Sequence, residues 1–194
     1  MQFVDVSEYK YRLIESINSI DELKIHQIVN EILQVRVNQR NIFIVGNGGS
    51  AASASHLATD LMFGSKLDMP PIKAISLADS TSSITATGND INFDNIFARP
   101  LKNLGSKGDL LFLISASGNS PNILACIGIS KKIGMKTIGL SGFDGGALAK
   151  QVDISLHVPT EFGCYGVVED THMIVGHIIT ELLKVQSAKE NING

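Results

Sequence analysis

The chain has 194 residues, of which 44% are hydrophobic and 18% are charged, a composition typical of a globular protein. Sixteen basic and 19 acidic residues give a formal net charge of −3, which argues against a nucleic-acid binder that works through bulk electrostatics. Its two cysteines, Cys126 and Cys164, are too few for a disulfide framework or a thiolate metal site, so we expect two free thiols. The sequence has neither a signal-peptide pattern nor an apolar run of about 20 residues, and it therefore predicts a cytoplasmic protein.

The first forty residues contain neither glycine nor proline, and their apolar residues recur at helical spacing. This pattern predicts two amphipathic helices. The second is expected to begin near Ile20, because Ser19 and Glu22 have the spacing of a capping box. The pattern is equally compatible with helices that pack on their own domain and with helices that form a subunit interface.

From Asn41 onward, short β-rich runs alternate with helical segments. This alternation predicts an α/β fold in which helices cover both faces of a parallel sheet. We predict a single domain over residues 1–194, with a helical segment at 1–40, an α/β core at 41–187 and a frayed polar tail. The predicted strands are residues 42–45, 72–77, 110–114, 137–140 and 154–158. The predicted helices of the core are residues 50–63, 80–87, 92–103, 121–133, 145–150 and 167–184.

Two loops rich in glycine and serine follow predicted strands. In the first, residues 46–52, glycines let the backbone approach an anion, and the first N–H groups of the next helix lack an intrahelical acceptor. In the second, residues 115–121, Ser120 can cap a helix and Pro121 suits its first position. One such loop alone is more simply explained as a capped turn. Two loops at the carboxyl ends of strands in one sheet favour a phosphorylated ligand held between them.

The first loop also matches the G-x-G-x-x-G/A pattern, which raises the alternative of a nicotinamide-dependent oxidoreductase. In that class an acidic residue that binds ribose follows about 20 residues later, whereas Asp79 lies 33 residues beyond Gly46. Neither loop has the lysine of a Walker A motif, which disfavours a nucleoside triphosphate. A phosphate monoester, bound by serine hydroxyls and backbone N–H groups, is the remaining ligand class.

Ionisable side chains gather on two predicted helices. His56 and Asp60 are four residues apart and therefore share one face of the helix that begins at the first loop. On the last helix, Glu169 and His177 are eight residues apart on neighbouring stripes. Together these four residues would supply oxygen and nitrogen ligands suited to zinc or another divalent ion. Spacing on two helices leaves open the simpler alternative, in which each histidine is an ordinary surface or hydrogen-bonded residue.

Five motifs stand in order along nearly the whole chain: residues 46–52 with His56, residues 88–90, residues 115–120, residues 142–146, and residues 169–172 with His177. Together they resemble the sugar isomerase (SIS) family, and within it the sedoheptulose 7-phosphate isomerase (phosphoheptose isomerase) group. The resemblance implies a flavodoxin-like, three-layer α/β/α sandwich. It also implies a homotetramer in which the N-terminal helices join a central bundle and the active sites lie between subunits.

The activity implied by the resemblance is an aldose–ketose isomerisation of a sugar phosphate. Members convert sedoheptulose 7-phosphate to D-glycero-D-manno-heptose 7-phosphate, which feeds heptose synthesis for bacterial surface polysaccharides. Such a reaction needs a base to move a proton between adjacent carbons, and an acid or a metal to stabilise charge on oxygen. Neither a nucleic acid nor a membrane is an expected partner.

The resemblance also assigns roles to individual positions. Asp60 is the base and a metal ligand, and His177 is the partner acid or base. His56 and Glu169 complete the zinc site in members that have one, and Glu169 also contacts substrate. The other substrate-binding positions that it implies are Asn47, Gly48, Gly49, Ser50, Asp90, Ser115, Ser117 and Ser120.

Four positions depart from the pattern of the group. Asp60, Gly64, Gly166 and Glu169 stand where the group commonly has Glu, Arg, Asp and Gln. The shorter acid moves its carboxylate by over an ångström, and a misplacement of that size can lower a rate about 100-fold. We therefore expect the reaction type to be retained more readily than the substrate. The alternative is a non-catalytic SIS protein, similar to replication-initiator-binding relatives that lack the acid/base pair; the acid at Asp60 and His177 favour the enzyme.

Overall fold

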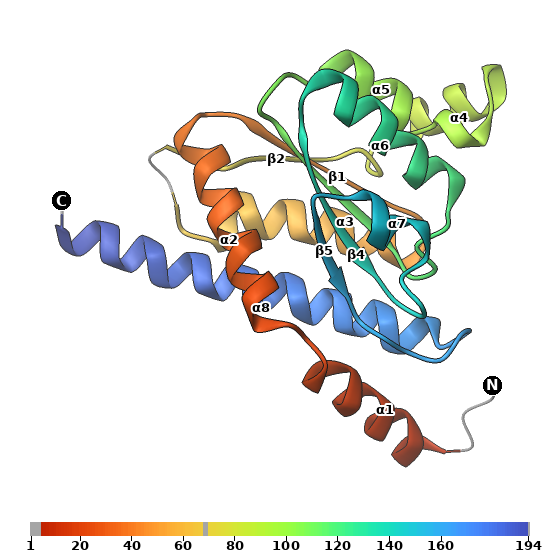
Figure 1. The fold of residues 1–194 in the computed structure, drawn as a ribbon. Coiled ribbons are helices and arrows are strands. Elements are labelled where there is room, and N and C mark those ends of the chain that lie inside the picture. The colour runs from red at the N-terminus through yellow and green to blue at the C-terminus, as the bar shows by residue number, and fades with distance from the viewer. Residues whose placement is uncertain (1–4, 68–69, 194) are drawn as a thin grey trace.

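Five parallel strands form one sheet in the order β2-β1-β3-β4-β5 in the computed structural model, which describes residues 5–67 and 70–193 (Figure 1). Each lies within a residue or two of its predicted position. The central strands β1 and β3 carry continuous runs of Ile, Leu, Val and Phe, which mark strands buried on both faces. The strands are β1 (Asn41–Gly46), β2 (Lys73–Ser76), β3 (Leu110–Ser115), β4 (Lys136–Ser141) and β5 (Ile154–His157).

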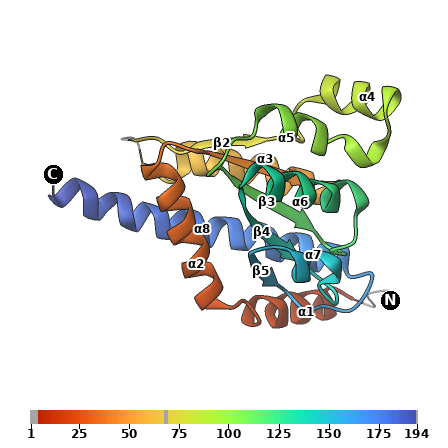
Figure 2. The same ribbon diagram turned by 45° about the horizontal axis from the view of Figure 1, so that its top comes forward.

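Helices cover both faces of this sheet, which confirms the predicted α/β/α sandwich (Figures 1 and 2). Side chains of β1 alternate between the two layers, Ile42 and Ile44 packing into one hydrophobic core and Phe43 and Val45 into the other. The first core is closed by α2 (Glu22–Val37), α3 (Gly49–Thr59) and α8 (Tyr165–Asn193). The second is closed by α5 (Ala98–Leu104), α6 (Pro121–Ile133) and α7 (Gly146–Gln151), while α4 (Thr81–Asp90) projects beyond them.

The N-terminal segment forms two helices, but the predicted start of the second is wrong. Helix α1 spans Val6–Asn18, and α2 begins at Glu22 after the N-cap Asp21, whose carboxylate accepts a hydrogen bond from the Lys24 N–H at 3.1 Å. Ser19 instead ends α1, because its hydroxyl donates to the Ser16 carbonyl at 2.7 Å. Helix α2 packs on its own domain, with Ile28 and other residues in the main core. A role of residues 1–40 in a subunit interface stays a prediction.

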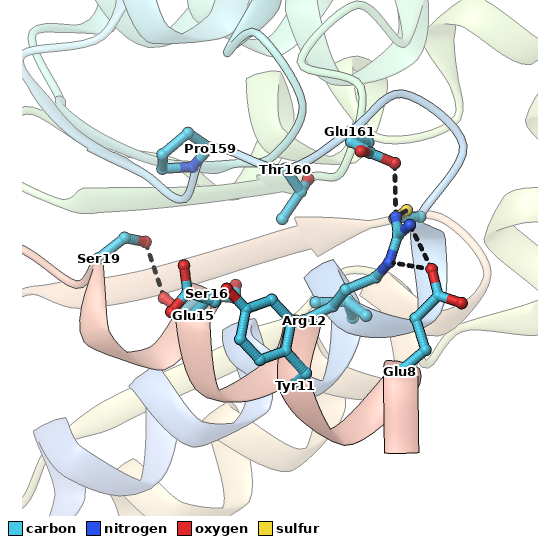
Figure 3. Close-up of a pocket in the computed structure, with 11 residues that line it drawn as sticks. Glu8, Tyr11, Arg12, Glu15, Ser16, Ser19, Pro159, Thr160 and Glu161 are labelled. Carbon is cyan, nitrogen blue, oxygen red and sulfur yellow. Dashed lines mark hydrogen bonds and ion pairs between the residues drawn. The ribbon is translucent and has the colours of Figure 1, made fainter. Parts of the chain in front are cut away.

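Helix α1 lies along the first half of α8 and is fastened to it by polar contacts. Arg12 pairs with Glu8 at 2.6 Å and with Glu161, in the segment after β5, at 2.5 Å (Figure 3). The hydroxyls of Ser16 and Thr171 hydrogen-bond at 2.8 Å. Between α1 and the segment after β5 lies a cavity of about 510 Å³. These contacts fix α1 beside the N-terminal end of α8.

Three helices differ clearly from their predicted bounds. The one predicted over residues 92–103 is a 3₁₀ turn at Phe93–Asn95 followed by α5, which begins only at Ala98. Helix α8 was expected over residues 167–184 but runs from Tyr165 to Asn193, and there the Ser187 hydroxyl donates to the Lys66 carbonyl at 2.6 Å. The predicted helix 50–63 is instead the α-helix α3 followed by a π-helical turn over Asp60–Gly64.

Within the described part of the chain, no helix combines the length and the apolar character needed to span a membrane.

Candidate active site

The two glycine- and serine-rich loops lie side by side because of the strand order. Strands β1 and β3 are neighbours, with Gly46 paired to Ile114, but the chain leaves β1 towards β2 and leaves β3 towards β4. Helices that follow such strands depart in opposite directions and leave a crevice at the carboxyl edge of the sheet. Ligands of flavodoxin-like proteins bind at this switch point. The fold therefore places both predicted phosphate loops at one site.

The first loop is a tight turn that delivers the start of α3 to this crevice. A Cβ atom on Gly46 would lie 2.3 Å from the backbone oxygen of Ser50, so only glycine permits the turn. Gly48 has a φ of 54° and precedes the first helical residue. The free N–H groups of the helix start therefore reach the crevice, together with the side chain of Ser50.

The second loop is joined to the first by a pair of amides that the sequence does not reveal. Asn47 and Asn122 exchange two hydrogen bonds of 2.8 Å each, and Asn122 is only 1% exposed in the first turn of α6. In the same loop the hydroxyls of Ser115 and Ser120 lie 3.3 Å apart. A buried asparagine within an apolar helix was the one available sequence signal for Asn122. The amide pair holds the two loops at a fixed separation.

Replacing Asn122 by alanine is expected to lower the free energy of unfolding by about 1–3 kcal/mol, because both hydrogen bonds to the partly buried amide of Asn47 are lost. Urea denaturation measures this change. Asn103→Ala, on the exposed side of α5, is the matched control and is expected to stay near the wild-type stability. Equal stabilities for Asn122→Ala and the control would contradict a structural role for the amide pair.

A cavity of about 140 Å³ opens between the loops and unites most of the predicted phosphate-binding residues. Its polar wall is made mainly of hydroxyl and amide groups, and Tyr165 forms an aromatic edge that sequence reasoning missed. Hydroxyls and helix-start N–H groups are the donors that bind a phosphate monoester. The residues that line the cavity are Asn47, Ser50, Ile114, Ser115, Ala116, Ser117, Ser120, Tyr165 and Glu169.

Glu169 forms an acidic wall of this cavity. Its carboxylate lies against Gly49, where a Cβ atom would come within 2.2 Å of Glu169 Oε2. Burial raises the pKa of this carboxyl, and the neighbouring Asp170 adds to the rise. Within one chain Glu169 does not join His177, because eight residues of helix rise separate them by about 12 Å along α8. Three of the four predicted metal ligands therefore come together without it.

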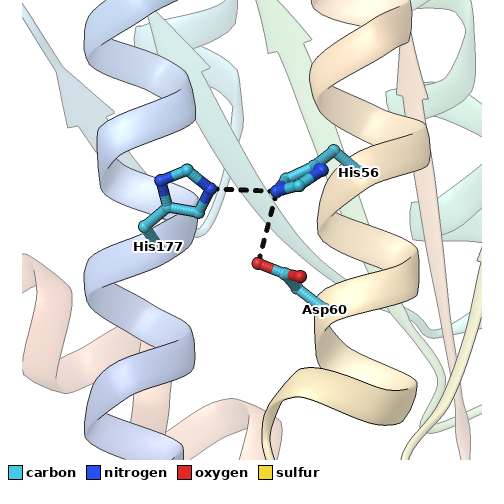
Figure 4. A group of neighbouring side chains, drawn as sticks. All are labelled: His56, Asp60 and His177. Carbon is cyan, nitrogen blue, oxygen red and sulfur yellow. Dashed lines mark hydrogen bonds and ion pairs between the residues drawn. The ribbon is translucent and has the colours of Figure 1, made fainter.

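Those three ligands, His56, Asp60 and His177, converge from α3 and α8 (Figure 4). His56 Nε2 lies 2.9 Å from His177 Nε2 and 3.4 Å from Asp60 Oδ2. The two imidazoles meet edge to face, with ring centroids 5.0 Å apart. Two facing Nε2 atoms attract each other only if one carries a proton or if both bind a cation. The group is thus equipped for proton transfer or for metal binding.

The donor set and its spacing fit a divalent metal ion. Zinc ligands lie about 2.0–2.2 Å from the ion, so two of them at the tetrahedral angle are about 3.4 Å apart. His56 Nε2 and Asp60 Oδ2 have this separation. The two imidazole Nε2 atoms are closer, at 2.9 Å, and would move apart around an ion, and the ligand atoms of all three residues lie within 4.8 Å of one another. Two imidazoles and one carboxylate match the three protein ligands of catalytic zinc sites, which keep a further position open.

One predicted substrate position, Asp90, and one position that departs from the family pattern, Gly166, stand apart from the serine cavity. Asp90 lines a separate cavity of about 320 Å³ between α4 and α5, together with Arg99. Gly166 faces α1, where a Cβ atom would lie 3.1 Å from Tyr9 Oη. The hydroxyl of Tyr9 donates to Asp170 at 2.5 Å. A tyrosine of α1 thus occupies the space beside position 166.

The fold and the site define a flavodoxin-like α/β protein with an anion cradle at the β1/β3 switch point and a His/Asp/His group nearby. A model of the SIS domain family matches residues 7–142. The chain belongs to the SIS domain family, and within it to the phosphoheptose isomerase group.

Named relatives and solved structures match over most of their length. The chain is 36% identical over 186 residues to the phosphoheptose isomerase of Sulfurimonas denitrificans, covering 96% of this chain and 93% of that one. It is 37% identical over 183 residues to the phosphoheptose isomerase of Helicobacter pylori strain P12, covering 94% of each chain. The structure of phosphoheptose isomerase GmhA from Neisseria gonorrhoeae superposes with a TM-score of 0.82 at 31% identity, covering 92% of this chain and 94% of that one.

Proposed function

We propose that this protein is an aldose–ketose isomerase that converts sedoheptulose 7-phosphate to D-glycero-D-manno-heptose 7-phosphate in the cytoplasm, for heptose synthesis. The observation that carries the proposal is the convergence of three residues: His56 and Asp60, on the segment that starts at the serine-lined cavity, meet His177 of α8. Relatives named phosphoheptose isomerase, at 36–38% identity over most of the chain, support the same reaction.

The chemistry asks for a proton to leave C1 of the ketose and for a proton to reach C2, while hydrogen moves between the two oxygens. Asp60 is the base that takes the C1 proton, and His177 serves the oxygens as acid and base. His56 hydrogen-bonds His177 and pairs with Asp60, so it holds both groups in position. When bound at these three residues, zinc would supply an electrophile that stabilises negative charge on the substrate oxygen.

The phosphate is assigned to the cavity between the two loops. Ser50, Ser115 and Ser120 offer hydroxyls there, and the start of α3 adds N–H groups and the positive end of a helix dipole. The hollow is small enough to take the phosphate alone and leaves the sugar outside. This placement requires the reacting carbons to extend away from the loops.

We also propose that each active site is completed by a second copy of the chain in a homotetramer. Within one chain, Glu169 lies about 12 Å along α8 from His177, and Asp90 lines a different cavity. Beside His177, the apolar side chains of Ile174, Ile178 and Leu182 line a further hollow on α8. A second copy that covered this apolar surface would bring its own residues towards the His/Asp/His group.

Mixing two inactive variants tests this shared site. Asp60→Asn removes the base, and Ser117→Asp puts a negative charge into the phosphate cavity. If the phosphate cavity and the base come from different chains, co-expressed subunits regain about a quarter of the wild-type activity, because random pairing makes one intact site in four. Light scattering is expected to report a tetramer. No recovered activity in mixed tetramers, or a monomer in solution, would contradict the shared site.

The isomerase itself is tested by incubating purified protein with sedoheptulose 7-phosphate, with and without zinc, and following the aldose phosphate by NMR. We expect slow to moderate turnover. If the protein converts another ketose phosphate but not sedoheptulose 7-phosphate, the proposed substrate is wrong, whereas the proposed aldose–ketose isomerisation is correct. Binding of sugar phosphates without conversion of any would favour the non-catalytic SIS protein.

A further inference from the structure

The π-helical turn after α3 brings Gly64 unusually close to the carboxylate of Asp60. The Ser65 N–H donates to the Asp60 carbonyl at 2.8 Å, five residues back rather than four. In an α-helix, Cβ atoms four residues apart lie about 5–6 Å from each other. Here a Cβ atom on Gly64 would lie 3.5 Å from Asp60 Cβ and 3.3 Å from Asp60 Oδ1. Residue 64 therefore borders the carboxylate itself.

The opposite side of Gly64 is closed by a side chain that has little freedom. A Cβ atom there would lie 3.1 Å from Thr180 Cγ2. Thr180 is 2% exposed on α8, and its hydroxyl donates to the Gly176 carbonyl at 3.0 Å. This hydrogen bond fixes the rotamer, so the methyl group cannot turn away without losing it. A side chain at residue 64 would therefore be in tight contact with both Asp60 and α8, and one of these neighbours would have to move by a few tenths of an ångström.

We propose that Gly64 is a positioning residue that, together with the π-helical turn, holds the short acid Asp60 against His56. A side chain at position 64 would meet a buried methyl on one side and a movable carboxylate on the other, so the carboxylate would shift. A shift of a few tenths of an ångström is what such a contact demands. It would act on the separation between Asp60 Oδ2 and His56 Nε2, which is 3.4 Å.

The test is Gly64→Ala, with Gly128→Ala as the matched control. Gly128 lies within α6, and a Cβ atom there would meet nothing within 4 Å. For Gly64→Ala we expect an affinity for Co²⁺ about tenfold below wild type, and a kcat about tenfold lower with an unchanged KM for sedoheptulose 7-phosphate. Gly128→Ala is expected to leave both values unchanged. Crystal structures of wild type and Gly64→Ala should show Asp60 Oδ2 displaced from His56.

A second variant tests whether the Thr180 methyl group is what directs the crowding towards Asp60. Thr180→Ser removes the methyl group that faces residue 64 and keeps the hydroxyl hydrogen bond. In Gly64→Ala/Thr180→Ser the new side chain gains room towards α8, so Co²⁺ affinity and kcat are expected to recover most of their loss. Recovery of stability alone, with Co²⁺ affinity and kcat still at the Gly64→Ala level, would overturn the proposal, because the loss would then not come from crowding between α8 and Asp60.

The turnover measurement rests on the proposed function, whereas the crystal structures and the metal titration do not. An Asp60 carboxylate that keeps its position in Gly64→Ala would overturn the inference whatever the reaction is. Wild-type protein that turns over no sugar phosphate would instead reject the proposed function, and the displaced carboxylate would still support the positioning role. The two failures are therefore distinguishable.

Discussion

Asp60→Asn is expected to lower the turnover of sedoheptulose 7-phosphate by about 10²- to 10⁴-fold, the usual contribution of a general base. The amide has the shape of the carboxylate but cannot accept the proton that leaves C1. Asp60 is partly exposed and lies 3.4 Å from His56 Nε2, so the substitution changes chemistry more than packing. Initial rates of aldose phosphate formation by NMR give the comparison, with circular dichroism as a check on folding.

Two further variants give this prediction its control. His177→Ala is expected to cause a loss of the same order, since it removes the acid that serves the substrate oxygens. Asp94→Asn neutralises an exposed carboxylate outside the site and is expected to keep the wild-type rate. An Asp60→Asn enzyme that retained a rate similar to that of Asp94→Asn would refute the role of Asp60 as the base.

Acid should destabilise the fold through His172, by up to about 3 kcal/mol. This side chain is 2% exposed on α8, and neither ring nitrogen has a hydrogen-bond partner among the described residues. Burial, with a smaller contribution from His157, outweighs the opposing effect of the Ser141 backbone and lowers its pKa to about 4. The unfolded chain takes up a proton on this imidazole near pH 6.5, whereas the folded protein does not until about pH 4. The contribution of His172 to the free energy of unfolding is therefore constant above about pH 6.5, and it becomes increasingly unfavourable as the pH falls from there to about 4.

Urea denaturation at pH 7 and pH 4.5 measures this loss. His172→Gln cannot take up the proton, so the difference in stability between the two pH values should shrink by most of that amount. His26→Gln, an exposed residue on α2, is the control and should leave the pH dependence as it is in wild type. An unchanged pH dependence in His172→Gln would show that the acid sensitivity arises elsewhere.

The architecture was predictable because its signals are local. Runs such as residues 110–114 are apolar throughout, and this pattern is typical of strands buried on both faces. Boundaries set by tertiary contacts were not predictable in the same way. The helix α8 extends to Asn193 with Ser187 bonded to Lys66, a residue more than a hundred positions away. The start of α2 was misplaced because two candidate caps, Ser19 and Asp21, lie two residues apart and only one is used.

The site was predictable in its parts but not in its assembly. Helical spacing places His56 and Asp60 on one face, but it does not show that His177 on another helix meets them. Glu169 was grouped with the metal ligands because it and His177 lie on neighbouring stripes of the helix surface. Sharing a side of a helix does not bring two residues together when eight residues, about 12 Å along the axis of α8, separate them. Asn122 was missed because its partner, Asn47, is 75 residues away. Gly64 carries no chemical group, and only the space around it reveals a role.

In the proposed reaction, this site moves a proton between C1 and C2 of a sugar phosphate. The most direct test is to run the reaction with sedoheptulose 7-phosphate in D₂O and to observe the C2 position of the aldose phosphate by proton NMR. His56 and His177 are exposed, so protons held by this site exchange with solvent. We predict deuterium at C2 in the product formed by the wild-type enzyme. Product that retained full protium at C2 would contradict proton transfer through a site that exchanges with solvent.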